Sequence, residues 1–301
     1  AAQRPARTMS NDELPGKFDI DDAWIQSRTG IATRGVANVE ETLVEMSAGA
    51  ASKAIAEAGI DPATIDLTIV ATSSNPITTP GIAPPLTDRL GLTSGAFDIM
   101  AACAGFCYSV NVAADSIRAG SARNVLVVGA ERITDRMDWN DRNTCYLFGD
   151  GAGAAIISAT DVDDDGIGPV VWGSDGALAD YIAQPMDSPY LQMDGQAVFK
   201  WAITELAGFA REACEKAGIE PKDLAAFVPH QANLRIVESV ARNLGVGEST
   251  VVADDVRYSG NTSAKKRSMP SSLATALATA VLSPVNMTTS IPRSCSCCTA
   301  G

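Results

Sequence analysis

Residues 54–62 read AIAEAGIDP, and residues 213–221, about half a chain later, read ACEKAGIEP. Each copy has the pattern of a helix end, a glycine that stops the helix, an acidic residue with proline in a turn, and then an apolar strand. A common helix–turn–strand unit can arise twice by chance, but its position in matching halves favours a duplicated fold. We therefore expect two similar α/β halves, at residues 1–160 and 161–301.

The rest of the chain alternates helix and strand patterns, which is typical of a layered α/β fold. The predicted helices are 41–58, 81–90, 103–119, 197–217 and 233–244. The predicted strands are 67–72, 96–99, 124–129, 152–158, 225–228 and 250–253. If two such halves pack face to face, equivalent strand ends lie close together, so one site can take residues from both halves.

Composition narrows the classes of protein. Of the 301 residues, 46% are hydrophobic and 20% are charged, as in ordinary globular chains. The formal net charge of −13 disfavours a nucleic-acid partner. The chain has no apolar run long enough to cross a bilayer and no signal-peptide pattern, so we expect no membrane insertion. Seven unevenly scattered cysteines do not resemble a secreted disulfide framework and favour a reducing, cytoplasmic location.

Two residues that carry reactive side chains follow predicted strands. Cys103 lies in ACAGF (102–106), between a predicted strand and a predicted helix, and His230, the only histidine, lies in PHQAN (229–233). A thiol attacks as its thiolate, and the start of a helix favours that charge. Histidine ionises near neutral pH. The pair indicates thiol-based acyl chemistry, with buried structural roles as the alternative.

Asn261 is a third candidate for the same site. It lies in SGNTS (259–263), after the predicted strand 250–253 and about thirty residues beyond His230. A plain Gly-Asn turn is the alternative interpretation. A neutral imidazole and an asparagine amide can both donate hydrogen bonds to a developing oxyanion or enolate.

Together, the runs around Cys103, His230 and Asn261 resemble the β-ketoacyl-ACP synthase III family of the thiolase superfamily. The resemblance covers about residues 9–264 and includes WIQSRTGI (24–31) and FGDGAGA (148–154). It implies a thiolase-like fold, in which two duplicated α/β halves form a five-layered αβαβα architecture, and a homodimer.

The resemblance also implies a reaction. Cys103 would take an acyl group from acyl-CoA, and its backbone N–H would serve the oxyanion of that step. His230 and Asn261 would bind the thioester carbonyl of malonyl-ACP during decarboxylation, and the carbanion would attack the acyl-Cys103 thioester. No cofactor is implied, because acyl-CoA is a substrate.

The resemblance also assigns binding roles to individual residues of this chain. Trp24 and Arg142 match the pair that sandwiches the CoA adenine, although Trp24 could instead be an ordinary core residue. Arg28 matches a nearby CoA contact, and Lys200 and Arg235 match a basic patch for acidic acyl carrier protein. The residues that match the tunnel lining are Phe148, Met193, Gly195, Phe199 and Asn233.

Thr79 stands where members that prefer acetyl primers carry a bulky phenylalanine, which reaches into the acyl pocket of the partner subunit. The smaller side chain predicts a roomier pocket for branched or longer primers.

Three sequence patterns superficially resemble calcium-, phosphate- or zinc-binding motifs. DVDDDG at 161–166 resembles the start of an EF-hand loop, but position twelve would be Trp172, so we interpret the segment as an acidic turn. The glycines of 149–153 lead into a predicted strand rather than a helix, which argues against a phosphate-binding loop. CSCC at 295–298 lacks a second pair at zinc-site spacing, so we expect no metal site.

Three stretches differ from the family. We expect its first strand to be absent before Ala1. The run AKKR at 264–267 is longer and more basic than the small residues expected there. Residues 286–298 show no periodicity, like a stretch read in a shifted frame. The family's C-terminal glycine loop, which supplies a second oxyanion donor, is therefore missing, and we expect the chain as written to be poorly folded or inactive.

The leading hypothesis is a synthase that starts fatty-acid or polyketide synthesis. Two alternatives stay open: a related acyltransferase of a polyketide pathway that forms esters, and a catalytically impaired relative that binds acyl carrier protein.

Overall fold

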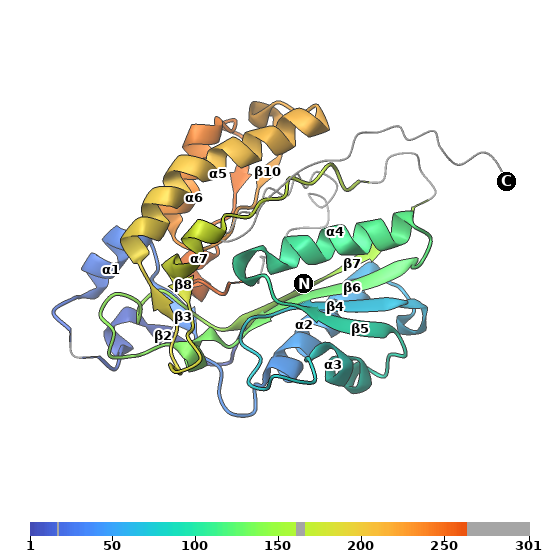
Figure 1. Cartoon of the computed structure of the whole chain (residues 1–301), viewed down its shortest axis with the longest axis horizontal. Helices are drawn as coiled ribbons and strands as arrows, with labels where there is room; N and C mark the ends of the chain where they lie inside the picture. The colour runs from blue at the N-terminus through green and yellow to red at the C-terminus, as the bar shows by residue number, and fades with distance from the viewer. Residues whose placement is uncertain (17, 161–165, 264–301) are drawn as a thin grey trace.

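The computed structural model describes residues 1–16, 18–160 and 166–263 (Figure 1). Its larger sheet has the strand order β1–β7–β6–β4–β5. These strands are β1 (Ala2–Gln3), β4 (Leu67–Ala71), β5 (Gly95–Ile99), β6 (Asn124–Glu131) and β7 (Gly151–Ser158). β4 pairs parallel with both β5 and β6, whereas β7 pairs antiparallel with β6 and β1. The carboxyl-terminal ends of β4, β5 and β6 therefore lie at the same end of the sheet.

Helices cover both faces of this sheet. Figure 1 shows α2 (Leu43–Ala58) and α3 (Ala83–Leu90) on one side and α4 (Gly105–Arg118) on the other. Successive side chains of a strand point to opposite faces. Accordingly, Val70 and Leu126 join the core beneath α2 and α3, whereas Ile69 and Val127 join the core beneath α4.

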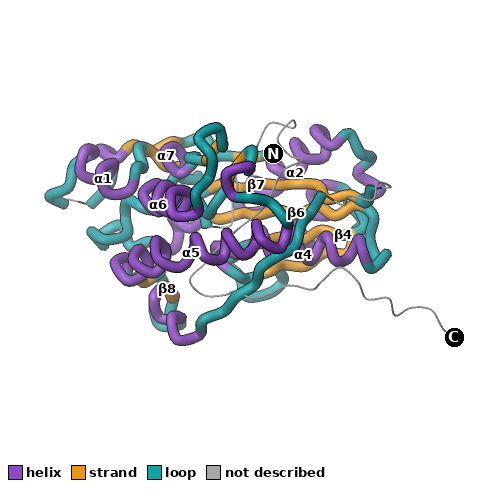
Figure 2. The backbone as a smooth tube through the Cα atoms, turned by 90° about the horizontal axis from the view of Figure 1, so that it is seen from above, coloured by secondary structure: helices purple, strands orange, loops and turns teal. Residues whose placement is uncertain are grey.

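The second half contains a smaller sheet under two long helices. β10 (Ala226–Phe227) pairs parallel with β11 (Val251–Val252). α5 (Gly195–Ala217) and α6 (Leu234–Leu244) lie side by side over them, as Figures 1 and 2 show. Leu206 of α5, Val240 of α6 and Phe227 share one buried cluster. From α2 and α3 through the large sheet, α4 and β10 to α5 and α6, the elements follow one another as layers.

The repeated sequence forms the same structure twice. α2 ends at Gly59 (φ +65°), and a 3-10 turn, η2 (Pro62–Thr64), leads into β4. α5 ends at Gly218 (φ +67°), and η6 (Pro221–Asp223) leads into β10. Both glycines adopt the left-handed conformation that terminates a helix. The predicted helix–glycine–turn–strand unit is confirmed in both copies.

Shorter elements complete the described part of the chain. They are β2 (Thr8–Ser10), η1 (Asn11–Glu13), α1 (Asp22–Thr29), β3 (Thr33–Gly35), η3 (Ala102–Ala104), η4 (Ile133–Arg136), η5 (Gly176–Tyr181), β8 (Ile182–Ala183), β9 (Gln192–Met193) and α7 (Val256–Ser259). β2 pairs with β3, and β8 pairs with β9, both antiparallel. Within the described ranges, no helix combines the length and apolar character that a membrane span requires.

Every helix and strand predicted from the sequence is present, with ends shifted by a few residues. The helix expected from residue 41 begins at Leu43, because the Thr42 hydroxyl accepts a hydrogen bond from Glu45 N (3.2 Å) and caps it. The helix expected from residue 103 begins at Gly105, since residues 102–104 form the 3-10 turn η3.

The expectation that the first strand is missing is wrong in part, because Ala2–Gln3 pairs with β7 as a short strand. Gly151 and Gly153 lie within β7, which confirms that they form a strand rather than a phosphate-binding loop. The acidic segment 161–165 and all predictions for residues 264–301, including the CSCC cluster, lie outside the described residues.

Candidate active site

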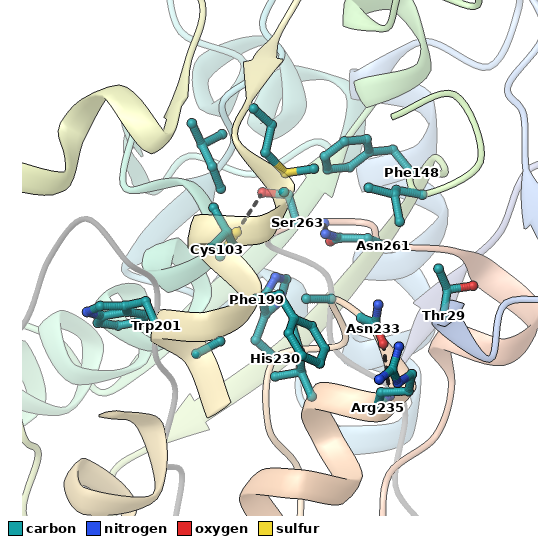
Figure 3. Close-up of a pocket in the computed structure, with 18 of the residues that line it drawn as sticks. Thr29, Cys103, Phe148, Phe199, Trp201, His230, Asn233, Arg235, Asn261 and Ser263 are labelled. Atoms are coloured by element: carbon teal, nitrogen blue, oxygen red, sulfur yellow. Dashed lines mark hydrogen bonds between the residues drawn. The ribbon is translucent and has the colours of Figure 1, made fainter. Parts of the chain in front are cut away.

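A cavity of about 890 Å³ is lined by residues from both halves of the chain. Cys103 reaches it from the first half, and His230 and Asn261 reach it from the second. Figure 3 shows the three side chains close to one another around the same space. The structure therefore brings together the three residues that the sequence analysis selected for their chemistry.

Cys103 lies in η3, between the end of β5 and the start of α4. The preceding residue, Ala102, has φ +43°, which is uncommon for a residue with a Cβ atom. A Cβ atom on Gly105 would lie 2.9 Å from Ala71 Cβ, so glycine allows α4 to approach β4 closely. The thiol thus lies at the start of α4, as predicted.

The expected stabilisation of the thiolate by the helix start is not the dominant effect. Burial raises the pKa of the Cys103 thiol to about 11, and the charge of Glu131 acts in the same direction, whereas a hydrogen bond with Ser263 lowers this pKa. Glu131 is fully buried at the end of β6, and burial raises the pKa of its own carboxyl. Its carboxylate accepts hydrogen bonds from Ser73 N (3.0 Å) and Ser73 Oγ (2.9 Å).

This high pKa gives a first prediction. In the substrate-free protein, the rate of Cys103 alkylation by iodoacetamide should rise about tenfold for each pH unit and should still be rising at pH ~9.5, because the thiolate remains a small fraction there. Peptide mass mapping of Cys103 against pH measures the rate. A plateau near pH ~8.5, where an ordinary thiol is half ionised, would contradict the prediction.

His230 follows β10 and is held through its neighbour. Gln231 is buried, and its Nε2 donates hydrogen bonds to Pro229 O (3.0 Å) and Ala253 O (3.1 Å). Its Oε1 accepts from Val256 N (3.1 Å). One amide side chain therefore ties the His230 loop to the segment that leads toward Asn261.

Asn261 is anchored on the backbone of the first half. Its N–H donates to Leu147 O (2.9 Å), and its carbonyl oxygen accepts from Gly149 N (3.0 Å), so it forms a bridge with Phe148. The side-chain oxygen Oδ1 accepts from Ser263 N (3.0 Å). That bond fixes the amide orientation and leaves Nδ2 as the donor available to the cavity.

Two glycines allow the backbones to cross at this point. A Cβ atom on Gly149 would lie 2.2 Å from Ser259 O, and Gly260 has φ +67°. The Arg34 side chain lies beneath the crossing, with its Cβ atom 3.1 Å from the position of an added Cβ on either glycine. Side chains at either position would push the Asn261 segment out of place.

Aromatic rings and cations line another part of the cavity. The guanidinium groups of Arg28 and Arg142 lie 5.4 and 5.3 Å from the centre of the Trp24 ring. Arg235 lies 5.1 Å from the Phe199 ring. These distances are typical of cation–π contacts, and the three arginines are exposed. The arrangement is suited to a ligand that combines a flat ring with negative charge.

The remaining tunnel candidates, Phe148, Met193, Gly195 and Asn233, also line the cavity. Asn233 also has a structural role, because its side-chain oxygen accepts a hydrogen bond from Arg235 N (2.9 Å) and caps α6.

Thr79 and Lys200, in contrast, do not line this chain's cavity, and both are exposed. The prediction for Thr79 concerns the acyl pocket of a partner subunit, and it stays a prediction. Lys200 lies on α5 between two cavity residues, Phe199 and Trp201, but does not line the cavity itself.

Several lining residues were not selected from the sequence. Ser73, Ile133, Leu191 and Trp201 reach the cavity from four different elements or loops, and Ser263 faces Cys103. Serines after strands and apolar residues in helices are common everywhere in proteins. Only their convergence in space distinguishes them, and the sequence contains no local signal for it.

Comparisons with known proteins agree with this geometry. Residues 97–176 match the family model described as 3-oxoacyl-[acyl-carrier-protein (ACP)] synthase III, and residues 214–288 match the C-terminal model of the same family. The second match extends beyond residue 264, where the resemblance noted in the sequence ended.

Curated relatives and solved structures cover most of the chain. A β-ketoacyl-[acyl-carrier-protein] synthase III 4 of Streptomyces coelicolor is 46% identical over 263 residues, which are 87% of this chain and 83% of that protein. A β-ketoacyl-[acyl-carrier-protein] synthase III of Mycobacteroides abscessus is 43% identical, over 94% of this chain and 86% of that protein.

The priming β-ketosynthase of the R1128 polyketide biosynthetic pathway has a similar structure. Its TM-score is 0.83 at 43% identity, over 92% of this chain and 84% of that one. The fold is therefore the thiolase fold of these enzymes, and the chain belongs to the β-ketoacyl-ACP synthase III family.

Proposed function

We propose that this chain joins an acyl-CoA primer to malonyl-ACP by decarboxylative Claisen condensation, as the first step of fatty-acid or polyketide synthesis. The observation that carries the proposal is the meeting of Cys103, His230 and Asn261 in one cavity. The names of the relatives support condensation over the ester-forming and impaired alternatives. The reaction uses only a thiol, an imidazole and an amide, so no cofactor is required.

In the first half-reaction, the Cys103 sulfur attacks the thioester carbonyl of acyl-CoA. The carbonyl oxygen becomes an oxyanion, which the Cys103 backbone N–H at the start of α4 can stabilise. The bond between the acyl carbon and the CoA sulfur then breaks. CoA leaves as its thiol after taking up a proton, and the acyl group stays on Cys103.

In the second half-reaction, His230 and Asn261 Nδ2 donate hydrogen bonds to the thioester oxygen of malonyl-ACP. Loss of CO₂ leaves an electron pair on the adjacent carbon, and the two donors stabilise the enolate that results. The carbanion attacks the acyl carbon, the bond to Cys103 breaks, and the thiolate takes a proton. The product is β-ketoacyl-ACP.

Trp24, Arg28 and Arg142 are suited to the CoA nucleotide, because an adenine ring can stack on the indole while the guanidinium groups contact its phosphates. We expect Trp24→Ala to raise the KM for acyl-CoA about tenfold with little change in kcat. Steady-state kinetics measures this change. With an acyl-pantetheine primer, which lacks the nucleotide, the variant and the wild type should have equal KM values, and a KM difference that persists there would contradict the assignment.

Lys200 and Arg235 are proposed contacts for acidic acyl carrier protein. Both side chains are exposed, and Arg235 lies at the cavity that the carrier's acyl arm must enter. On a chain of net charge −13, local cations matter mainly for steering the carrier to the entrance.

A homodimer is proposed from the edge of the large sheet. β5 is the last strand in the sheet order, so one side of its backbone has no neighbouring strand among the described residues. Phe97 in β5 is 40% exposed, and the nearby Ile77 and Met100 are 55% and 83% exposed. We further propose that Thr79, which is exposed, reaches the partner's cavity in this dimer, where its small side chain would leave room for branched or longer primers.

Light scattering after gel filtration tests the dimer. The expected mass is twice the 31.2 kDa of one chain, and Phe97→Lys should reduce it to a single chain. A wild-type protein that elutes as a monomer at micromolar concentration would rule out the stable dimer proposed here.

The proposal also covers the boundary between the two halves and the compartment in which the protein works. We place the boundary between the two halves near residue 160, after β7. A reducing, cytoplasmic compartment fits a nucleophile that must stay reduced. Cys103, Cys145 and Cys214 carry thiols that are not joined in disulfide bonds.

Intact-protein mass spectrometry tests the function directly. The protein is incubated with a panel of acyl-CoAs, and Cys103→Ala serves as the control. A mass gain of one acyl group that is absent from the control, followed by its transfer to malonyl-ACP as a β-ketoacyl product, is expected. No gain with any thioester would overturn acyl transfer, and an ester product would favour the related acyltransferase.

A further inference from the structure

Ser263 faces Cys103 across the cavity and has no role in the steps described so far. Its Oγ lies 3.9 Å from Cys103 Sγ, within hydrogen-bond distance for sulfur (Figure 3). Ser263 is buried, with 7% of its surface exposed, so water does not compete freely for the hydroxyl. The contact joins the loop that holds Asn261 to the turn that holds the nucleophile.

We propose that Ser263 is a further catalytic residue, whose hydroxyl donates a hydrogen bond to the Cys103 sulfur whenever that sulfur carries negative charge. The inference rests on the acyl-transfer function proposed above. A neutral thiol can donate or accept, but a thiolate can only accept, so ionisation makes the Ser263 O–H the donor. Because hydrogen bonds to ionised partners are roughly twice as strong as neutral ones, the contact stabilises the thiolate more than the thiol.

The surroundings of Cys103 make such a donor necessary. Cys103 is half-buried at the wall of the cavity. Burial raises the pKa of its thiol, and the nearby carboxyl group of Glu131 raises this pKa further. Glu131 accepts hydrogen bonds from the hydroxyl groups of Ser73 and Ser74, which lower the pKa of its carboxyl and so oppose the effect of burial. The Ser263 hydroxyl acts against both effects.

The sulfur becomes charged twice in each catalytic cycle. It first loses its proton to attack acyl-CoA. It is then expelled when the carbanion attacks the acyl carbon, because the electron pair of the breaking C–S bond goes to sulfur. Between these events it is a neutral thioester and a weak acceptor. The hydroxyl therefore stabilises the start of the first half-reaction and the end of the second.

Ser263 has an unusual backbone conformation. Its φ of +44° lies in the left-handed region, which is unfavourable for a residue with a Cβ atom. Its N–H donates to Asn261 Oδ1 (3.0 Å) in the same conformation. A glycine would adopt this φ without strain but would carry no hydroxyl, so the strained serine serves two functional groups at once.

The test compares Ser263→Ala with Ser263→Gly. Both variants keep the backbone N–H that orients Asn261, and both lose the hydroxyl. We expect each to slow Cys103 alkylation by iodoacetamide at fixed pH by about 10- to 100-fold, the range for one hydrogen bond to a charged group. Acylation by the preferred acyl-CoA should slow by a similar factor. Ser121→Ala, which removes an exposed hydroxyl far from the cavity, should leave both rates unchanged.

Whether the rate of Cys103 alkylation falls or rises distinguishes a catalytic role of Ser263 from a structural one. A cavity loosened by substitution would admit water, lower the pKa of Cys103 and speed its alkylation, so an unchanged or faster rate in Ser263→Ala overturns the proposal. A wild-type rate in the glycine variant, which also lacks the hydroxyl, would likewise overturn it. Because alkylation needs no acyl-CoA, this measurement decides the role of Ser263 even if the proposed acyl transfer fails.

Discussion

Replacing His230 with alanine should slow condensation with malonyl-ACP by about 100- to 1,000-fold, because one of two donors to the enolate oxygen is lost. Acylation of Cys103 by acyl-CoA should remain within a few-fold of the wild type, since its oxyanion is served by the Cys103 backbone N–H. The variant should therefore accumulate acyl-enzyme that is not consumed. Rapid-quench mass spectrometry of the two half-reactions measures both rates.

Asn261 supplies the matched comparison for His230. Asn261→Asp keeps the side-chain shape and the oxygen that accepts from Ser263 N, but it replaces the donor Nδ2 with a second oxygen. We expect it to slow condensation as strongly as His230→Ala. If either variant slowed acylation of Cys103 as strongly as condensation, the assignment of His230 and Asn261 to the condensation step alone would be wrong.

Replacing Arg34 with alanine should lower the free energy of unfolding by about 3–5 kcal/mol, through a void and unpaired acceptors. Arg34 is fully buried. Its guanidinium donates hydrogen bonds to Asn11 Oδ1, Ser10 O (3.3 Å) and Tyr146 O (3.2 Å), and so joins the junction of β2 and η1 to the segment before Phe148. Burial lowers the pKa of Arg34 to about 10, which shows how strongly the protein removes this cation from water.

Urea unfolding followed by circular dichroism measures this loss. Arg123→Ala, at an exposed position, is the control and should change the free energy of unfolding by less than about 0.5 kcal/mol. Arg34→Lys should also be destabilised, because an ammonium group cannot reproduce the planar fork that reaches several acceptors. If Arg34→Ala unfolded at the same urea concentration as the wild type, the guanidinium would not be needed to hold these two segments together.

The fold was largely predictable from local patterns. The Gly59 and Gly218 helix ends, and the turns and strands that follow them, depend on residues within about ten positions of each other. The same holds for the position of Cys103 between a strand and a helix. His230 and Asn261 could be selected because their side chains are chemically informative and because each follows a strand.

The electrostatics of the site were not predictable in this way. The start of α4 is visible in the sequence and favours a thiolate, but the pKa of Cys103 is raised instead. The cause is desolvation by distant parts of the chain, together with Glu131 at the end of β6. Ser263 was missed for the same reason, since its contact with Cys103 joins residues 160 positions apart.

The bridge between Phe148 and Asn261 bears on how a duplicated fold can acquire a single site. Each half contains the same helix–turn–strand unit, yet one carries the nucleophile and the other carries the two donors. Because the Asn261 backbone is hydrogen-bonded to residues 147 and 149, the half that carries the donors is positioned in part by the other half. The two halves are therefore complementary rather than interchangeable, because the nucleophile and the donors reach one cavity from different halves and neither half alone contains all three residues.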